Sequence, residues 1–133
     1  MNFLKLPRAL SIIIINHVND HSPEEACGLL AGVDHQVSLV IPVTNQLHSP
    51  VKYYMVPVEL LRALETIESK ELSLLGIFHS HPNGPSTPSP TDIREFLYPG
   101  VVTIICYPEE NDWRIKGFMI ENNGFSEVEM RIG

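Results

Sequence analysis

Apolar residues near the beginning of the chain recur at the three- and four-residue spacing of an amphipathic helix. Across residues 7–21 these positions are Leu10, Ile13, Ile14 and Val18. Side chains at this spacing share one face of a helix, and Pro7 stands where a first helical turn tolerates proline. We therefore expect a helix from about Pro7 to His21.

A second amphipathic pattern begins at Pro57, in the middle of the chain. Its apolar positions are Val58, Leu61, Leu64 and Ile67. The intervening polar positions are Glu59, Arg62 and Thr66. We expect the apolar face of this helix to pack on the core and the polar face to meet water.

Six shorter apolar runs are bounded by turn-forming residues, as β-strands are. They cover residues 26–31, 37–43, 72–78, 101–107, 113–120 and 125–132. A third, short helix should begin near Pro90 and end before Pro99, because proline interrupts a helix. Together these elements predict an α/β (α+β) fold in which helices cover a sheet.

Length and composition place all the elements in one folded unit. The 133 residues suffice for a single compact domain over 1–133 and are few for two. A content of 44% hydrophobic and 19% charged residues is ordinary for a folded protein. Cys27 and Cys106 both lie in apolar runs, which favours small buried side chains over a disulfide without excluding one.

Charge and hydropathy narrow the range of partners. A formal net charge of −7 disfavours nucleic acid, because phosphates are bound by clustered lysine and arginine. The apolar run from Ile12 to Ile15 is far shorter than the roughly 20 residues that span a bilayer. No signal-peptide cleavage site accompanies it. We expect a cytoplasmic protein without membrane contact.

The stretch Phe78-His79-Ser80-His81-Pro82 carries candidate chemistry where a predicted strand ends. Alternate side chains of a strand point to the same side, so the two imidazoles can converge while Ser80 faces away. A His-x-His pair alone is weak evidence for a metal. The other histidines fall in polar or turn contexts, where we expect solvated side chains: His17, His21, His35 and His48.

A third metal ligand can come from the segment that follows the histidines. Four prolines and a glycine between residues 82 and 90 make it a rigid irregular loop, which could fold back and offer the Asp92 carboxylate. Two histidines and one aspartate leave a tetrahedral position for water, the open pattern of a catalytic zinc site. Residues 89–92 also form a good helix start with Ser89 as N-cap, and the two roles are compatible.

Hydrolysis at a zinc ion also needs a group that accepts the proton of the attacking water and passes it on. Glu24 and Glu25 stand at the entry to the predicted strand 26–31, where an inward-pointing charge needs a reason. Spacing alone does not choose between them. Cys27 is of a type that can act as a nucleophile, but its apolar neighbours favour a buried core residue.

The order of these residues resembles the signature of the JAMM metallopeptidases, also called MPN-plus domains. In that signature a glutamate is followed by His-x-His, seven residues, serine, two residues and aspartate. Glu25, His79, His81, Ser89 and Asp92 match it position for position. The segment 25–30 is also similar to the one around the family's catalytic glutamate, which favours Glu25 over Glu24. The likeness extends over nearly the whole chain.

This resemblance implies a fold, a metal and residue roles. The fold would be a mixed sheet flanked by helices, related to the cytidine-deaminase fold. One Zn²⁺ ion with a catalytic water would be held by His79, His81 and Asp92. Glu25 would be the general acid and base, and Ser89 a hydroxyl that helps to hold the water or the developing oxyanion.

The resemblance also implies a substrate. The family hydrolyses isopeptide or peptide bonds after the C-terminal Gly-Gly of ubiquitin-like proteins. The short connections of this chain resemble the small prokaryotic members, which act on ubiquitin-like sulfur-carrier proteins. The first alternative is a non-catalytic MPN scaffold, disfavoured because every motif position is intact. The second is a small-molecule zinc hydrolase such as a deaminase, which usually needs paired cysteine ligands. The oligomeric state, a homodimer included, is left open.

Overall fold

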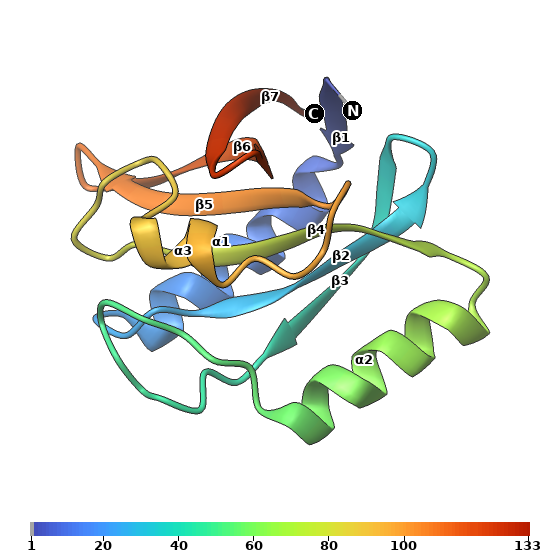
Figure 1. The fold of residues 1–133 in the computed structure, drawn as a ribbon, viewed down its shortest axis with the longest axis horizontal. Coiled ribbons are helices and arrows are strands. Elements are labelled where there is room, and N and C mark those ends of the chain that lie inside the picture. The colour runs from blue at the N-terminus through green and yellow to red at the C-terminus, as the bar shows by residue number, and fades with distance from the viewer. Residues whose placement is uncertain (1) are drawn as a thin grey trace.

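The computed structural model describes residues 2–133, within which seven strands form one closed sheet (Figure 1). The strands are β1 (Phe3–Leu6), β2 (Cys27–Val33), β3 (Gln36–Val43), β4 (Ser73–Ser80), β5 (Val102–Glu109), β6 (Asp112–Glu121) and β7 (Gly124–Ile132). Their order around the barrel is β1, β3, β2, β4, β5, β6, β7. Parallel pairs join β1 to β3, β1 to β7 and β4 to β5, and the other pairs are antiparallel. The expected mixed sheet is confirmed, in a closed form.

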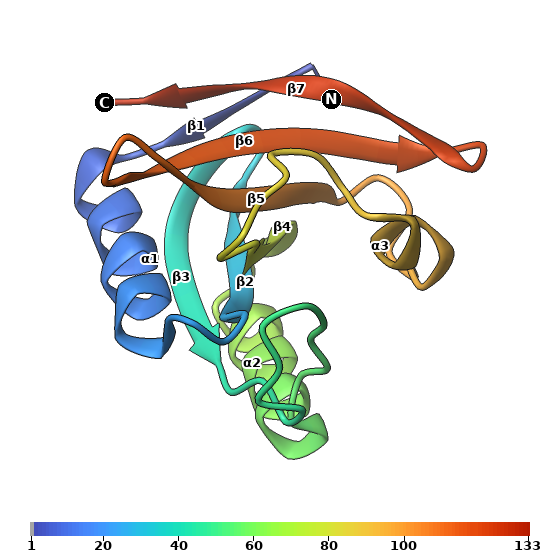
Figure 2. The ribbon, with the colours of Figure 1, turned by 90° about the vertical axis from the view of Figure 1, so that its left-hand side faces the viewer.

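Three helices accompany this sheet in the described residues, as the sequence predicts. They are α1 (Arg8–His21), α2 (Pro57–Ser69) and α3 (Pro90–Arg94). Figure 2 shows α1 on one side of β2 and β3, with α2 and the short α3 away from it on the other side. None of these helices has the length and apolar run needed to cross a bilayer.

The core is divided by the sheet into two apolar clusters. The cluster on the α1 side includes Leu4, Leu6, Ile14, Val18, Leu30, Phe78 and Ile104. The cluster on the α2 side includes Cys27, Leu29, Val43, Ala63, Ile67 and Ile77. A Cβ atom at Gly28 would lie 2.3 Å from the Phe78 ring, so β2 and β4 can approach this closely only with glycine there.

The predicted buried face of α2 was partly wrong. The helix packs on the core through Leu60, Ala63, Leu64 and Ile67, whereas Val58 and Leu61 are 50% and 58% exposed. Glu59, expected in water, is half-buried, and its Oε1 accepts a hydrogen bond from the Thr44 backbone N–H at 2.9 Å. The bond is compatible with the observed orientation, in which a neighbouring apolar stripe faces the sheet.

Strand β1 was not predicted, although the alternation of a half-buried strand was present. Leu4 and Leu6 are fully buried, while Lys5 between them is exposed. The strand pairs with β7 from Phe3 opposite Glu129 to Leu6 opposite Ile132. It thereby closes the sheet into a barrel.

The two cysteines are buried as expected, whereas two histidines are less exposed than expected. Cys27 and Cys106 are buried and unbridged, and burial raises the pKa of each thiol to about 12, so the buried-core interpretation is confirmed. His17 and His35 were expected in solvent but are half-buried. The His17 Nε2–H donates to the Cys27 carbonyl at 3.1 Å, and His35 stacks on the Phe3 ring.

Candidate metal centre

Because side chains alternate along β4, the two histidines point to one face of the sheet, whereas Phe78 and Ser80 point to the other. Phe78 belongs to the cluster on the α1 side, whereas Ile77 belongs to the one on the α2 side. Ser80 is fully buried, and its Oγ accepts a hydrogen bond from the Ala26 N–H at 2.8 Å. Its own N–H donates to the Ala26 carbonyl at 2.9 Å. These two bonds fasten the end of β4 to the start of β2, beside Glu25.

The two imidazoles and the Asp92 carboxylate form a compact triangle. His79 Nε2, His81 Nε2 and Asp92 Oδ2 each lie 3.1 Å from the other two atoms. Ligands bonded to a tetrahedral zinc at roughly 2.0–2.1 Å lie about 3.3 Å apart. The side chains are 1%, 5% and 10% exposed. Spacing, donor type and burial therefore fit a zinc ion with one further position open.

Asp92 takes part in a helix cap and also contacts both histidines. Its Oδ2 accepts a hydrogen bond from the Ser89 N–H at 2.8 Å, and the Ser89 Oγ accepts one from the Asp92 N–H at 3.0 Å. This reciprocal pair is a capping box at the start of α3. The same Oδ2 reaches both histidines, so the cap holds the carboxylate at the site. The Ser89 hydroxyl keeps its own proton to donate.

The charge states of the triangle follow from burial and mutual contact. Burial alone would raise the pKa of Asp92, but hydrogen bonds with His79 and His81 outweigh it and hold that pKa well below its usual range. Burial lowers the pKa of His79, which favours the neutral imidazole. For His81, burial works in the same direction, but contact with Asp92 raises the pKa overall. A metal, which needs neutral imidazoles, would therefore compete with a proton at His81.

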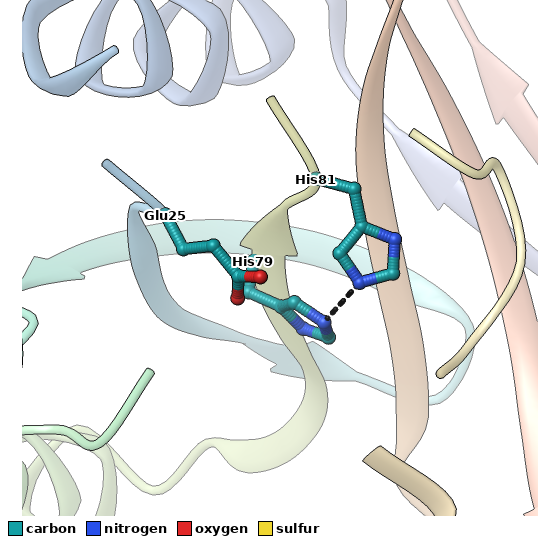
Figure 3. A group of neighbouring side chains, drawn as sticks. All are labelled: Glu25, His79 and His81. Carbon is teal, nitrogen blue, oxygen red and sulfur yellow. Dashed lines mark hydrogen bonds between the residues drawn. The ribbon is translucent and has the colours of Figure 1, made fainter. Parts of the chain in front are cut away.

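Glu25 lies beside the triangle, and its carboxylate points toward the two imidazoles (Figure 3). It is 5% exposed, and one of its oxygens lies within 4.8 Å of a ring nitrogen of each histidine. Burial raises the pKa of Glu25 to about 8, assisted by the Asp92 charge and opposed by His81. Glu24 is turned instead to His48, with its Oε1 3.1 Å from Nδ1. The geometry thus brings Glu25, and not Glu24, to the histidines.

Two residues at the site were missed by the sequence analysis. The Tyr53 ring stacks on His79 with centroids 4.5 Å apart and 28° between planes. Asn45 is 5% exposed, and its Nδ2 donates to the Glu25 carbonyl at 3.0 Å. The Glu25 N–H in turn donates to the Ser49 carbonyl at 2.8 Å, so the backbone of Glu25 is held on both sides.

Comparison with known proteins identifies the family to which this site belongs. The model of the Prok-JAB family, "Prokaryotic homologs of the JAB domain", matches residues 7–116. The chain belongs to this family. The expected resemblance to small prokaryotic JAMM proteins is thereby confirmed.

Named relatives of this Prok-JAB chain are peptidases. A protein of Thermus thermophilus described as a "Probable TtuB-protein conjugate cleaving protease" is 45% identical over 93 residues, which cover 69% of this chain and 62% of that protein. A "Desampylase" of Pyrococcus furiosus is 37% identical over 109 residues, covering 82% and 76%. The chain thus matches less than two thirds of the Thermus protein's length.

Solved structures agree with the fold of the Prok-JAB chain. A solution structure of a Desulfitobacterium hafniense protein superposes with a TM-score of 0.88 at 32% identity, covering 98% of this chain and 93% of that one. A JAB1/MPN domain protein of Archaeoglobus fulgidus gives 0.63 at 22% identity, with full coverage of both chains. The second likeness concerns the fold alone, and it confirms the expected MPN-type architecture.

Proposed function

We propose that this Prok-JAB protein is a zinc-dependent peptidase that hydrolyses the bond after the C-terminal Gly-Gly of a ubiquitin-like or sulfur-carrier protein. The observation that carries the proposal is the triangle of His79, His81 and Asp92 with Glu25 beside it. Buried ionisable side chains that converge in this way are costly to fold. A site with perturbed pKa values is a candidate for chemistry.

In this proposal His79, His81 and Asp92 hold the ion. A bound zinc would make water nucleophilic near neutral pH and polarise the carbonyl of the scissile bond. The neutral His79 imidazole and the ionised Asp92 carboxylate are the forms that coordinate a metal. The capping box keeps the carboxylate oriented before the ion arrives.

Glu25 is the group that moves the proton. Its raised pKa, about 8, lies close to neutral pH, where a side chain can both take a proton and return it. It takes the proton from the attacking water and delivers it to the leaving amine. Two hydrogen bonds keep Glu25 beside the histidines. Asn45 donates to the Glu25 carbonyl, and the neighbouring Ala26 N–H donates to the Ser80 Oγ.

Ser89 contributes its hydroxyl. The Ser89 Oγ accepts from the Asp92 N–H, and accepting this bond does not use the hydroxyl proton, which we propose is donated to the substrate. A donor aimed at developing negative charge stabilises the transition state of acyl transfer. In this role Ser89 would steady the oxyanion that forms as water adds to the carbonyl.

The substrate class rests on the named relatives, which act on TtuB-protein conjugates or are called desampylases. The carrier tail and its attached lysine or peptide are thus the proposed substrate. Neither thiol supports a deaminase: Cys27 Sγ donates to the Val43 carbonyl at 3.4 Å, and Cys106 lies in the cluster on the α1 side. A scaffold protein would not need the buried, charged triangle.

The test is a mass measurement on defined substrates. Ubiquitin-like carrier proteins, either extended past Gly-Gly or joined to a lysine side chain, are mixed with the protein alone, with a chelator, and with zinc restored after chelation. We expect products that end at Gly-Gly, loss of cleavage with chelator and recovery with zinc. Intact substrates in every arm would contradict the proposal.

A further inference from the structure

The two histidines of the triangle differ at the ring nitrogen that faces away from it. The Nδ1–H of His81 donates to the Pro85 carbonyl at 2.8 Å, which fixes the tautomer and leaves Nε2 free to bind a metal. In residues 2–133 no protein group is hydrogen-bonded to His79 Nδ1, which is buried. Metal-binding histidines are usually oriented by such a bond, so something else must orient His79.

The Tyr53 ring is positioned to do this. It lies on the face of the His79 imidazole with centroids 4.5 Å apart and 28° between planes. A stacked ring resists tilting of its neighbour, because turning the imidazole about its Cβ–Cγ bond would push its edge into the face of the tyrosine ring. His79 itself is 1% exposed, and its opposite neighbour in the triangle, His81, meets it edge-on at 4.9 Å. The imidazole is thus confined by two rings.

Asn45 in turn holds the segment that carries Tyr53. Its Nδ2 donates to the Lys52 carbonyl and its Oδ1 accepts from the Tyr54 N–H, both at 3.1 Å. These are the residues on either side of Tyr53. The same amide donates to the Glu25 carbonyl, so one buried side chain ties the segment of the aromatic ring to the proposed base.

We propose that Tyr53 is a positioning residue of the zinc site, whose ring, in place of a hydrogen bond, holds the plane of the His79 imidazole in which Nε2 faces His81 and Asp92. This inference rests on the zinc site of the proposed function. It assigns the ring, and not the phenol hydroxyl, because the contact with His79 is made by stacking. Asn45 keeps the ring over the imidazole.

The test compares three variants by zinc affinity, measured in the absence of substrate by competition with a metal indicator. Tyr53→Leu removes the ring, Tyr53→Phe keeps it without the hydroxyl, and Tyr54→Leu is the matched control, since the neighbouring tyrosine is 55% exposed. Loss of a group that orients a metal ligand typically costs about tenfold to a hundredfold in affinity. We expect that loss for Tyr53→Leu, and wild-type affinity for Tyr53→Phe and Tyr54→Leu.

A spectroscopic measurement separates positioning from a general effect on folding. In the cobalt-substituted protein, the visible absorption bands report ligand geometry; they should change in Tyr53→Leu and stay as in the wild type in Tyr53→Phe. Wild-type zinc affinity and cobalt bands in a folded Tyr53→Leu would overturn the inference. If Tyr53→Leu does not fold, Tyr53→Phe still decides: a tenfold loss there would overturn it, since the hydroxyl would then carry the role.

The outcomes for this inference and for the proposed function can be told apart. A wild-type protein that binds zinc but leaves carrier conjugates intact would contradict the function and leave the role of Tyr53 standing. Cleavage by the wild type, with zinc affinity unchanged in Tyr53→Leu, would contradict only the role of Tyr53.

Discussion

Neighbouring residues of strand β4 point to opposite faces of the sheet and have different surroundings. On the α1 side, Phe78 is fully buried among aliphatic side chains and rests on Gly28. On the α2 side, His79 is buried almost as completely, yet its neighbours are an imidazole, a carboxylate and a tyrosine ring. The apolar face stabilises the fold by excluding water. The polar face lowers stability, because burying polar groups costs free energy. Variants on the two faces should therefore fail in different assays.

Glu25→Gln should have the largest effect, and only on activity. The amide cannot exchange a proton near neutral pH, so cleavage should fall by about 10²- to 10⁴-fold. Zinc content and the melting temperature should not fall, because glutamine is uncharged and similar in size to the protonated glutamic acid that the raised pKa favours. The measurement is the rate of carrier release with zinc content determined on the same sample. A variant that cleaves at the wild-type rate would show that Glu25 is not the base.

Phe78→Ala should act on the opposite face and reduce stability. Truncating a fully buried phenylalanine typically costs about 3–5 kcal/mol, and here it would leave a cavity between β4 and Gly28. Urea unfolding checks this, with Leu97→Ala as the control because that side chain is 78% exposed. Equal unfolding midpoints for the two variants would contradict the claim that the apolar face of β4 stabilises the fold.

His17 should give a smaller, pH-dependent effect at the edge of the apolar face. Burial, with the nearby His21, lowers the pKa of His17 from 6.5. Near and below pH 6.5 the unfolded chain therefore binds more protons at this histidine than the folded chain does. The contribution of His17 to the free energy of unfolding is fully present above this pH and is lost as the pH falls. Urea unfolding between pH 5 and 7.5 should show a shallower decline in His17→Gln than in the wild type. Parallel curves would contradict the assignment.

The sequence indicated the three residues of the triangle better than the residues that surround them. Alternation along a strand explains why His79 and His81 lie together. The loop pattern allowed Asp92 as a ligand or as part of a helix cap, and the proposed ligand set came from the resemblance to the JAMM signature. Tyr53 and Asn45 have no such local signature. Their partners are 26 and 20 positions away in the chain, and stacking or amide bonding across a loop follows only from the tertiary fold.

The errors in the predicted fold have physical causes as well. In α2, two apolar stripes lie side by side, and periodicity alone does not say which of them faces the core. In β1, four residues alternate as in a half-buried strand, but so short a strand depends on its pairing with β3 and β7. The sheet closes where β1 pairs with β7, and these strands lie at opposite ends of the chain. A local sequence pattern cannot predict such a contact.

The central claim is that His79, His81 and Asp92 hold one zinc ion, and native mass spectrometry of the purified protein tests it most directly. The wild type should carry one zinc per chain, and Glu25→Gln should carry the same. His79→Ala and Asp92→Ala should carry none while remaining folded by circular dichroism. Zinc retained at full stoichiometry in both alanine variants, or a wild type that binds no zinc when it is supplied, would contradict the account.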